Sequence, residues 1–287
     1  APDHPYVQEH PQWFKWRPGA RGREQGIHGM LDTQGNPTER YTAVAETSAF
    51  TQRLAPLLNR SRTEVRVAVL TSSDNAYLAY ADGGPTRRAR DRWDTLCRML
   101  DIARIPFDEI DPAWLEEGDL SPYRTIIAAN VPVLSDRALR RLRSFAEEGG
   151  AVIEHPDVAT RDGLGHPRDR VKFAESPRET DGWSLRQPSE GDGPVHSEAV
   201  GGGIWLSCGW VVPPTFESEE ILVERAEAYA EVLLRHDVAA PAARVRTPVS
   251  PHLVDVRRLR AGPCTLLFLT GLTEDPVAPV RVTLPGV

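Results

Sequence analysis

Three side chains near the N-terminus have chemistry suited to gripping a sugar or an acid. Trp16, Glu24 and His28 lie within residues 14–41, which begin with aromatic and basic residues and pass through a glycine-containing turn. An indole face can pack on the apolar face of a pyranose, and a carboxylate can accept two hydrogen bonds from neighbouring hydroxyls. These residue types suit a binding loop. The alternative is a loop that the same groups hold in place through local hydrogen bonds.

A cysteine follows an apolar run further along the chain. Cys208 ends residues 204–208 and precedes Gly209. Catalytic cysteines of class I amidotransferases occupy a tight turn from strand to helix, with His and Glu completing a triad. Here residues 211–214 intervene before any helix, and no H-x-E motif follows. We therefore predict a buried structural cysteine, with a catalytic thiol as the alternative.

A histidine ends another apolar run, residues 151–155. Parallel sheets bind ligands at the carboxyl ends of their strands, which is where His155 would lie. This placement supports a hypothesis in which a sugar or a nucleotide binds near Ser72, Asp74 and His155. The more common alternative is a loop histidine that is hydrogen-bonded to its neighbours.

Composition narrows the class of protein. The 287 residues carry a net charge of −7, which argues against nucleic acid or an anionic membrane as a main partner. No apolar run approaches the roughly 20 residues that span a bilayer. Three widely spaced cysteines match neither a disulfide framework nor a zinc site, which favours a cytoplasmic location without metal or cofactor. The chain begins at Ala1 without a signal peptide, as a processed protein or a fragment would.

The central part of the chain alternates strands and helices. Prolines break up residues 1–45, and a helix is predicted from Thr38 as N-cap to residue 58. Strands are predicted at residues 65–70, 105–110, 123–130 and 151–155, and a polar loop at 71–74. Helices are predicted at residues 89–102 and from Ser135-Asp136 to Gly149-Gly150. Short βα steps of this kind predict an α/β, flavodoxin-like parallel sheet with helices on both faces.

The rest of the chain has weaker patterns. Residues 157–203 are rich in Gly, Pro, Asp, Ser and Arg, which indicates long loops with at most short strands. A strand at residues 204–208 and a helix at 218–236 follow. Residues 244–287 alternate apolar and polar positions between Pro and Gly turns, so we predict a small C-terminal antiparallel β domain.

Residues 14–41 resemble the end of the catalytic barrel in glycoside hydrolase family 42, the β-galactosidases. There a W-R pair precedes a loop of the form G-x-E-Q-x-x-H-G-x-L-D-x-x-G-x-P-x-x-R-Y. The matching residues are Trp16-Arg17, Gly22, Glu24-Gln25, His28-Gly29, Leu31-Asp32, Gly35, Pro37 and Arg40-Tyr41. The preceding H-P-Q-W-F also resembles a loop of other glucan-processing barrels.

The resemblance continues along the chain and implies a domain division. Residues 1–60 are similar to the end of the barrel and its last helix. Residues 61–240 are similar to the family's trimerisation domain, which is related to class I glutamine amidotransferases, and residues 241–287 to its last β domain. The resemblance implies a homotrimer and a parent activity on β-galactosides. It also implies that Trp16 forms a wall of the galactose subsite and that Glu24 and His28 bind the sugar hydroxyls.

One requirement of the family is not met. Retaining hydrolysis needs an acid/base and a nucleophile, two carboxyl groups roughly 5–5.5 Å apart, on earlier barrel strands. Only fifteen residues precede Trp16 and cannot supply them. We therefore expect a non-catalytic C-terminal portion of a family 42-like β-galactosidase, which assembles subunits and shapes a neighbour's active site. The alternative is a stand-alone amidotransferase-like module that binds a sugar or a nucleotide.

Overall fold

The described residues of this chain fall into two compact units, which we treat separately. The first contains the residues up to Arg62, with the turn at residues 261–263, and the second contains the rest. The computed structural model describes residues 30–32, 34–81, 86–156, 158–168, 195–209, 212, 216, 218–239, 241, 243–246, 254–271 and 280–284.

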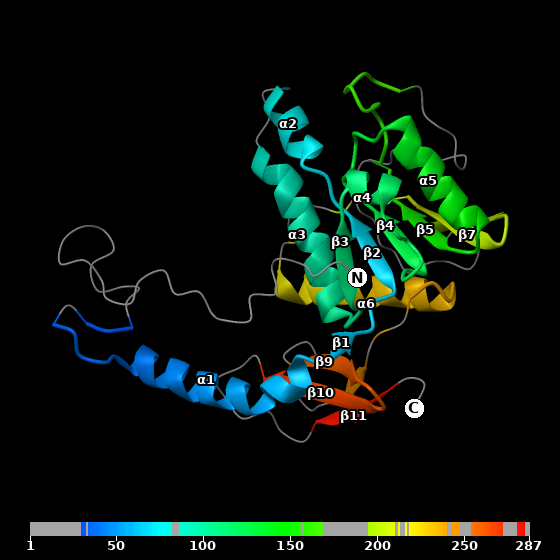
Figure 1. Ribbon diagram of the computed structural model, residues 1–287. Coiled ribbons are helices and arrows are strands. Elements are labelled where there is room, and N and C mark those ends of the chain that lie inside the picture. The colour runs from blue at the N-terminus through cyan, green and yellow to red at the C-terminus, as the bar shows by residue number, and fades with distance from the viewer. Residues whose placement is uncertain are drawn as a thin grey trace. The chain divides into compact units, whose positions relative to one another are not determined.

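A six-stranded sheet forms the centre of the second unit (Figure 1). Its order is β3-β2-β4-β5-β7-β6, in which the first five strands run parallel and β6 runs antiparallel to β7. The parallel strands therefore follow the order 2-1-3-4-5 of flavodoxin-like folds, which confirms the predicted fold class. The strands are β2 (Val67–Leu70), β3 (Phe107–Ile110), β4 (Thr125–Ala128), β5 (Ala151–Glu154), β6 (Val195–Val200) and β7 (Gly203–Cys208).

Helices cover both faces of this sheet. α3 (Thr86–Ile102) and α6 (Glu219–Arg235) pack on the face that carries Val67 and Val69. α4 (Pro112–Glu117) and α5 (Asp136–Glu147) pack on the opposite face. Strands β2 and β4 are buried along their whole length, so their continuous apolar runs are those of a sheet covered twice.

Local signals set the ends of these helices. The Ser135 hydroxyl accepts a hydrogen bond from the backbone N–H of Ala138 at 2.9 Å, which caps α5 as the sequence predicted. Asp111 caps α4 in the same way, with Trp114 N–H as the donor at 2.7 Å. Gly149, with φ of 107°, follows α5 in the left-handed conformation that favours glycine. Two helices were not predicted, α4 and α2 (Asp74–Ala81), the latter directly after β2.

The hairpin from β6 to β7 is fixed to the end of α5 through the backbone. Val200 pairs with Gly203, so Gly201 and Gly202 form a two-residue loop. Gly201 has φ of 58°, the sign that a type II′ turn requires at its first central residue. The N–H of Gly202 donates to the carbonyl of Glu147 at 2.9 Å. The position of both strands is therefore set by main-chain contacts.

The C-terminal strands form two small sheets. β8 (Arg244–Arg246) pairs antiparallel with β11 (Arg281–Thr283). β9 (Val254–Ala261) and β10 (Cys264–Gly271) form a hairpin, and β1 (Arg62–Thr63) lies beside β9. These sheets share a small apolar core of their own, as predicted for a C-terminal β module. Its buried residues are Ala243, Val245, Val254 and Val256.

Two arginines connect these strands to the parallel sheet. Arg104 follows α3 with φ of 56°, and its guanidinium donates to the carbonyl of Val254 at 3.2 Å. Arg257 on β9 lies 3.4 Å from Asp101 of α3 and 3.0 Å from Asp255. Burial raises the pKa of Asp101, while Arg257 opposes that shift. The end of α3 is thus the polar attachment point of β9.

The described part of the first unit contains a turn and one long helix. Asp32 accepts hydrogen bonds from the N–H groups of Gln34 and Asn36, and α1 (Glu39–Leu58) follows. Thr38 is the N-cap residue of α1 as predicted, but its hydroxyl donates to the carbonyl of Met30 at 2.8 Å rather than capping the helix. None of the 20 residues of α1 is buried. Among the described helices, none has both the length and the apolar content needed to cross a bilayer.

Candidate functional site

The carboxyl edge of the parallel sheet is where an α/β fold of this topology places its ligands. The loops that follow β2, β4 and β5 meet there. They bring Ser72, Asn130 and His155 to one edge, as the sequence predicted for Ser72 and His155. Ser72 is nearly buried, and its hydroxyl accepts the N–H of Asp74 at 3.2 Å. Asn130 takes the left-handed conformation, with φ of 55°.

His155 lies inside the protein rather than at its surface. Its side chain is fully buried, and the backbone N–H of His155 donates to the carbonyl of Ala128 at 3.0 Å. Nε2 lies 3.3 Å from the hydroxyl of Tyr229 on α6, with ring centroids 6.0 Å apart. Burial raises the pKa of Tyr229 well above its ordinary value, so the phenol is neutral. A ligand at the edge cannot reach this histidine, which acts instead as a packed, hydrogen-bonded core residue.

Cys208 lies in the same interior region. It is 5% exposed at the end of β7 and belongs to the core beneath α3 and α6. Burial, with a smaller effect from the charge of Glu154, raises the pKa of this thiol. Because the thiolate is the nucleophilic form, Cys208 has neither the access nor the ionisation that covalent catalysis requires. The predicted burial of this cysteine is confirmed.

A second polar pair joins β5 to β7. The indole N–H of Trp205 donates to the Glu154 carboxylate at 2.7 Å. Trp205 is 3% exposed and contributes to the core beneath α4 and α5. Neither residue was singled out by sequence reasoning. The glutamate at the end of an apolar run was the only local signal, and its partner lies 51 residues later.

A loop after β5 covers the neighbouring strand end. The N–H of Ala159 donates to the carbonyl of Val131 at 2.9 Å, and the N–H of Arg161 donates to that of Pro132 at 2.8 Å. Val133 and Arg161 form a parallel bridge. Residues 158–168 therefore extend the pairing of β4 and β5 past the sheet. This loop lies within the region that the sequence predicted to be irregular.

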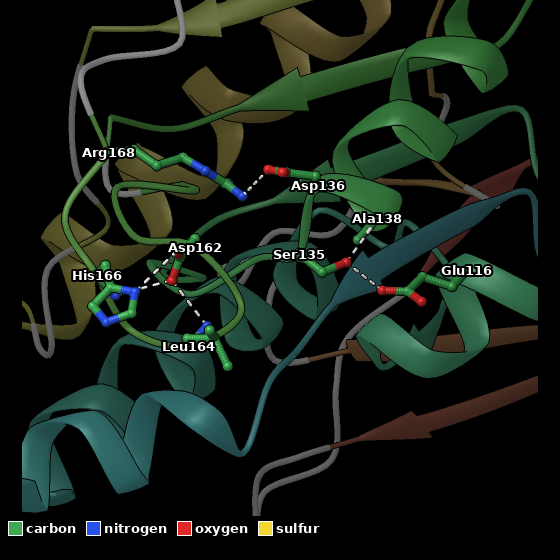
Figure 2. A network of polar contacts seen from close by, with 8 residues as sticks. All are labelled: Glu116, Ser135, Asp136, Ala138, Asp162, Leu164, His166 and Arg168. Carbon is green, nitrogen blue, oxygen red and sulfur yellow. Dashed lines mark hydrogen bonds and ion pairs between the residues drawn. The ribbon is translucent and has the colours of Figure 1, made fainter.

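Polar contacts hold the tip of this loop in one conformation (Figure 2). Asp162 Oδ1 accepts the N–H groups of Leu164 and His166, each at 2.9 Å. These bonds, that of His166 first, hold the pKa of Asp162 below its usual range. Arg168 reaches Asp136 at the start of α5, as Figure 2 shows. The tip presents Leu164 to solvent, 84% exposed.

The N-terminus of α5 completes the network. Ser135, which accepts the N–H of Ala138, also donates its hydroxyl proton to the carboxylate of Glu116 on α4 (Figure 2). Arg137 lies 3.1 Å from Glu117. These groups bind one another, so the edge is stabilised by its own side chains. Among the described residues, no three His, Cys, Asp or Glu side chains are grouped as a metal site would need.

The first predicted binding loop lies elsewhere in the chain. Trp16, Glu24 and His28 fall outside the described residues, so their predicted contacts with a sugar stay predictions. The end of that motif is described, from residue 30 onwards. Leu31 bridges Pro37, and Asp32 organises the turn between them.

Known proteins resemble this chain over part of their length. Beta-galactosidase GanA of Bacillus subtilis is 27% identical over 184 residues, which are 59% of this chain and 26% of GanA. The structure of a catalytic mutant of Gan42B, a GH42 beta-galactosidase from G. stearothermophilus, superimposes with a TM-score of 0.69 at 19% identity. That superposition covers 91% of this chain and 42% of Gan42B. The chain is related to GH42 β-galactosidases.

The relationship is partial. The matched region spans about a quarter of the curated relative GanA, and the chain spans less than half of the solved structure. No family model matches the chain. A short match of another kind, 46% identity over 41 residues, is to an alpha-1,4-glucan:maltose-1-phosphate maltosyltransferase of Chlorobaculum tepidum. It covers 14% of this chain and 5% of that enzyme, too little to describe the whole.

Proposed function

We propose that this chain is a non-catalytic portion of a GH42-like β-galactosidase, and that it assembles subunits and shapes the active site of a neighbour. The activity of the assembled enzyme would be the hydrolysis of β-galactosides. The relationship to GH42 proteins over less than half of a solved relative supports this proposal. So does the packed interior of the sheet edge, where the only buried histidine among the described residues contacts Tyr229.

The observation that carries the proposal is a row of partly exposed apolar residues on α1. Phe50, Leu54 and Leu57 are spaced i, i+4 and i+7, the spacing of one helix face. Phe50 is 52% exposed and Leu57 is 48% exposed. An apolar face of this kind gains free energy when another surface covers it, and a closed symmetric oligomer offers such a surface to every copy. We therefore assign the α1 face to a subunit contact.

Light scattering on the purified chain tests the assembly role. We expect a trimer or another closed oligomer. Replacing Leu57→Glu should weaken it, because a carboxylate would be buried in the contact. Gln52→Glu makes the same charge change on the opposite side of the helix, where we expect no effect. A strict monomer at high concentration, or equal effects of the two substitutions, would contradict the proposal.

A chromogenic β-galactoside tests the absence of catalysis. This chain alone should not cleave it, since it covers 42% of the solved relative and we expect the two carboxyl groups of a retaining glycosidase in the remainder. Turnover that survives repurification would refute the proposed division of labour.

The alternative function is a module that binds a sugar or a nucleotide near Ser72, Asp74 and His155. One of these three residues is not accessible to a ligand. His155 is fully buried, and only Asp74 of the three is exposed. No observation on the described edge favours a ligand there over the contacts already made.

A further inference from the structure

The antiparallel strand β6 is the last strand of the sheet. It pairs with β7 on one side, and no described strand pairs with its other side. Its four central residues, at positions 196–199, are all exposed. Because successive side chains point to opposite faces, β6 is exposed on both faces of the sheet. Such a strand presents a row of backbone N–H and C=O groups to which another strand can pair.

Symmetry restricts how β6 can pair with its own copy. A two-fold axis normal to the sheet gives antiparallel strands and places one residue opposite itself. An axis at His196 sets imidazole against imidazole, and an axis at Glu198 sets carboxylate against carboxylate. An axis at Ser197 sets His196 against Glu198 of the second copy, and the reverse pair forms on the other side. Both the neutral and the protonated imidazole can donate a hydrogen bond to a carboxylate, so this register forms two complementary pairs.

We propose that β6 pairs antiparallel with β6 of a second copy of this chain, about a two-fold axis at Ser197. The two six-stranded sheets then form one continuous sheet through the interface. Charge complementarity selects both the occupant and the register. The contact is small compared with a standard interface of about 1,600 Å², so it is a weak dimer that forms at high concentration. It is separate from the α1 face and does not rest on the proposed function.

Charged edge residues can also serve to prevent pairing. Edge residues of that kind prevent pairing because their like charges repel a second copy. In β6 the central register instead brings unlike groups together. The two interpretations predict opposite effects of changing the edge charges, so substitutions at positions 196 and 198 separate them.

Disulfide cross-linking tests the position of the two-fold axis. In antiparallel pairs, opposite Cα atoms are about 4.5 or 5.5 Å apart, within the range of about 4.4–6.8 Å that a disulfide bridges. Ser197→Cys in a Cys264→Ser background should therefore form a covalent dimer under mild oxidation. Ala199→Cys is the matched control, because its two copies would be roughly 14 Å apart along the strands. Equal cross-linking at the two positions, or none at position 197, would overturn the proposal.

Charge reversal tests the register by sedimentation equilibrium, in a Leu57→Glu background that removes the α1 contact. His196→Glu and Glu198→Arg should each weaken dimerisation about 2-fold to 30-fold, because two cross-strand pairs are lost. The double variant His196→Glu/Glu198→Arg restores unlike pairs and should restore dimerisation. Glu231→Arg, on the exposed side of α6, makes the same charge change as Glu198→Arg and should have no effect.

Several results would refute the pairing. A Leu57→Glu protein with wild-type β6 that stays monomeric at every concentration would do so. Equal dimerisation of this protein and all three edge variants would do so as well. A double variant that dimerises no more strongly than the single ones would refute the register, and single variants that dimerise more strongly than the wild type would show that the edge charges prevent pairing. Far-UV circular dichroism of each variant confirms that the fold is retained, so a loss of dimer is read as a loss of contact.

Discussion

Gly203, the first residue of β7, lies where an added side chain would meet the backbone of α5 and of the turn that follows it. A Cβ added there would lie 2.9 Å from the carbonyl carbon of Gly149 and closer still to the carbonyl oxygens of Gly150 and Ala146. All three atoms belong to the backbone, so no side chain can move aside. Overpacking costs typically 1–3 kcal/mol, and a backbone obstacle belongs at the upper end, so we expect Gly203→Ala to cost about 3 kcal/mol.

The neighbouring glycine is the control. A Cβ on Gly202 would have its nearest atoms at 3.5–3.7 Å, which is ordinary contact. Gly202→Ala should therefore stay within about 0.5 kcal/mol of the wild type. Thermal unfolding followed by circular dichroism should show a melting temperature about 6–12 °C lower for Gly203→Ala. Similar melting temperatures for the two variants would refute the conclusion that the β6–β7 hairpin is fixed by main-chain contact with α5.

The remaining predictions concern titratable groups. Iodoacetamide should label the exposed Cys264 in the native protein and Cys208 only after unfolding, because burial keeps the Cys208 thiol protonated; mass spectrometry of the labelled peptides checks this. Burial first, and then Asp108, which accepts the Tyr123 hydroxyl at 3.1 Å, raise the pKa of Tyr123 to about 12. Since an unfolded tyrosine titrates near pH 10, the contribution of Tyr123 to stability is complete below about pH 10 and lost as the pH rises toward 12. Urea unfolding should thus show a smaller alkaline loss of stability for Tyr123→Phe, and equal losses in the two proteins would contradict the assignment.

Elements with local signals at both ends were predictable. Ser135 begins α5 with a cap, Gly149 ends it, and Leu139, Leu142 and Phe145 face the sheet. α2 carries no such pattern, since Tyr77 and Tyr80 are 72% and 80% exposed. β6 has no buried side to mark it, because four consecutive residues face solvent. It is a strand because β7 supplies its hydrogen-bond partners, and that pairing cannot be read from residues 195–200 alone.

The same division holds at the carboxyl edge of the sheet. The position of His155 at a strand end follows from the apolar run before it, and this part was predictable. Its burial depends on Tyr229, which lies 74 residues later on α6. The ordered loop tip at Asp162 was not predicted, because the composition of residues 157–203 indicates only irregular structure. Which side chains fill a strand edge is decided by segments that are distant along the chain.

The attachment of β9 to α3 has a consequence for the order of folding. Arg104 and Val254 are 150 positions apart, and Arg257 and Asp101 are 156 apart. Contacts of such long range close large loops, and they form slowly compared with the neighbouring pairings inside the parallel sheet. During synthesis from the N-terminus, every strand of the six-stranded sheet leaves the ribosome before β9 does. The small C-terminal sheets therefore join a scaffold that can already be complete, and the hydrogen bond from Arg104 to the carbonyl of Val254 forms only after β9 has been synthesised.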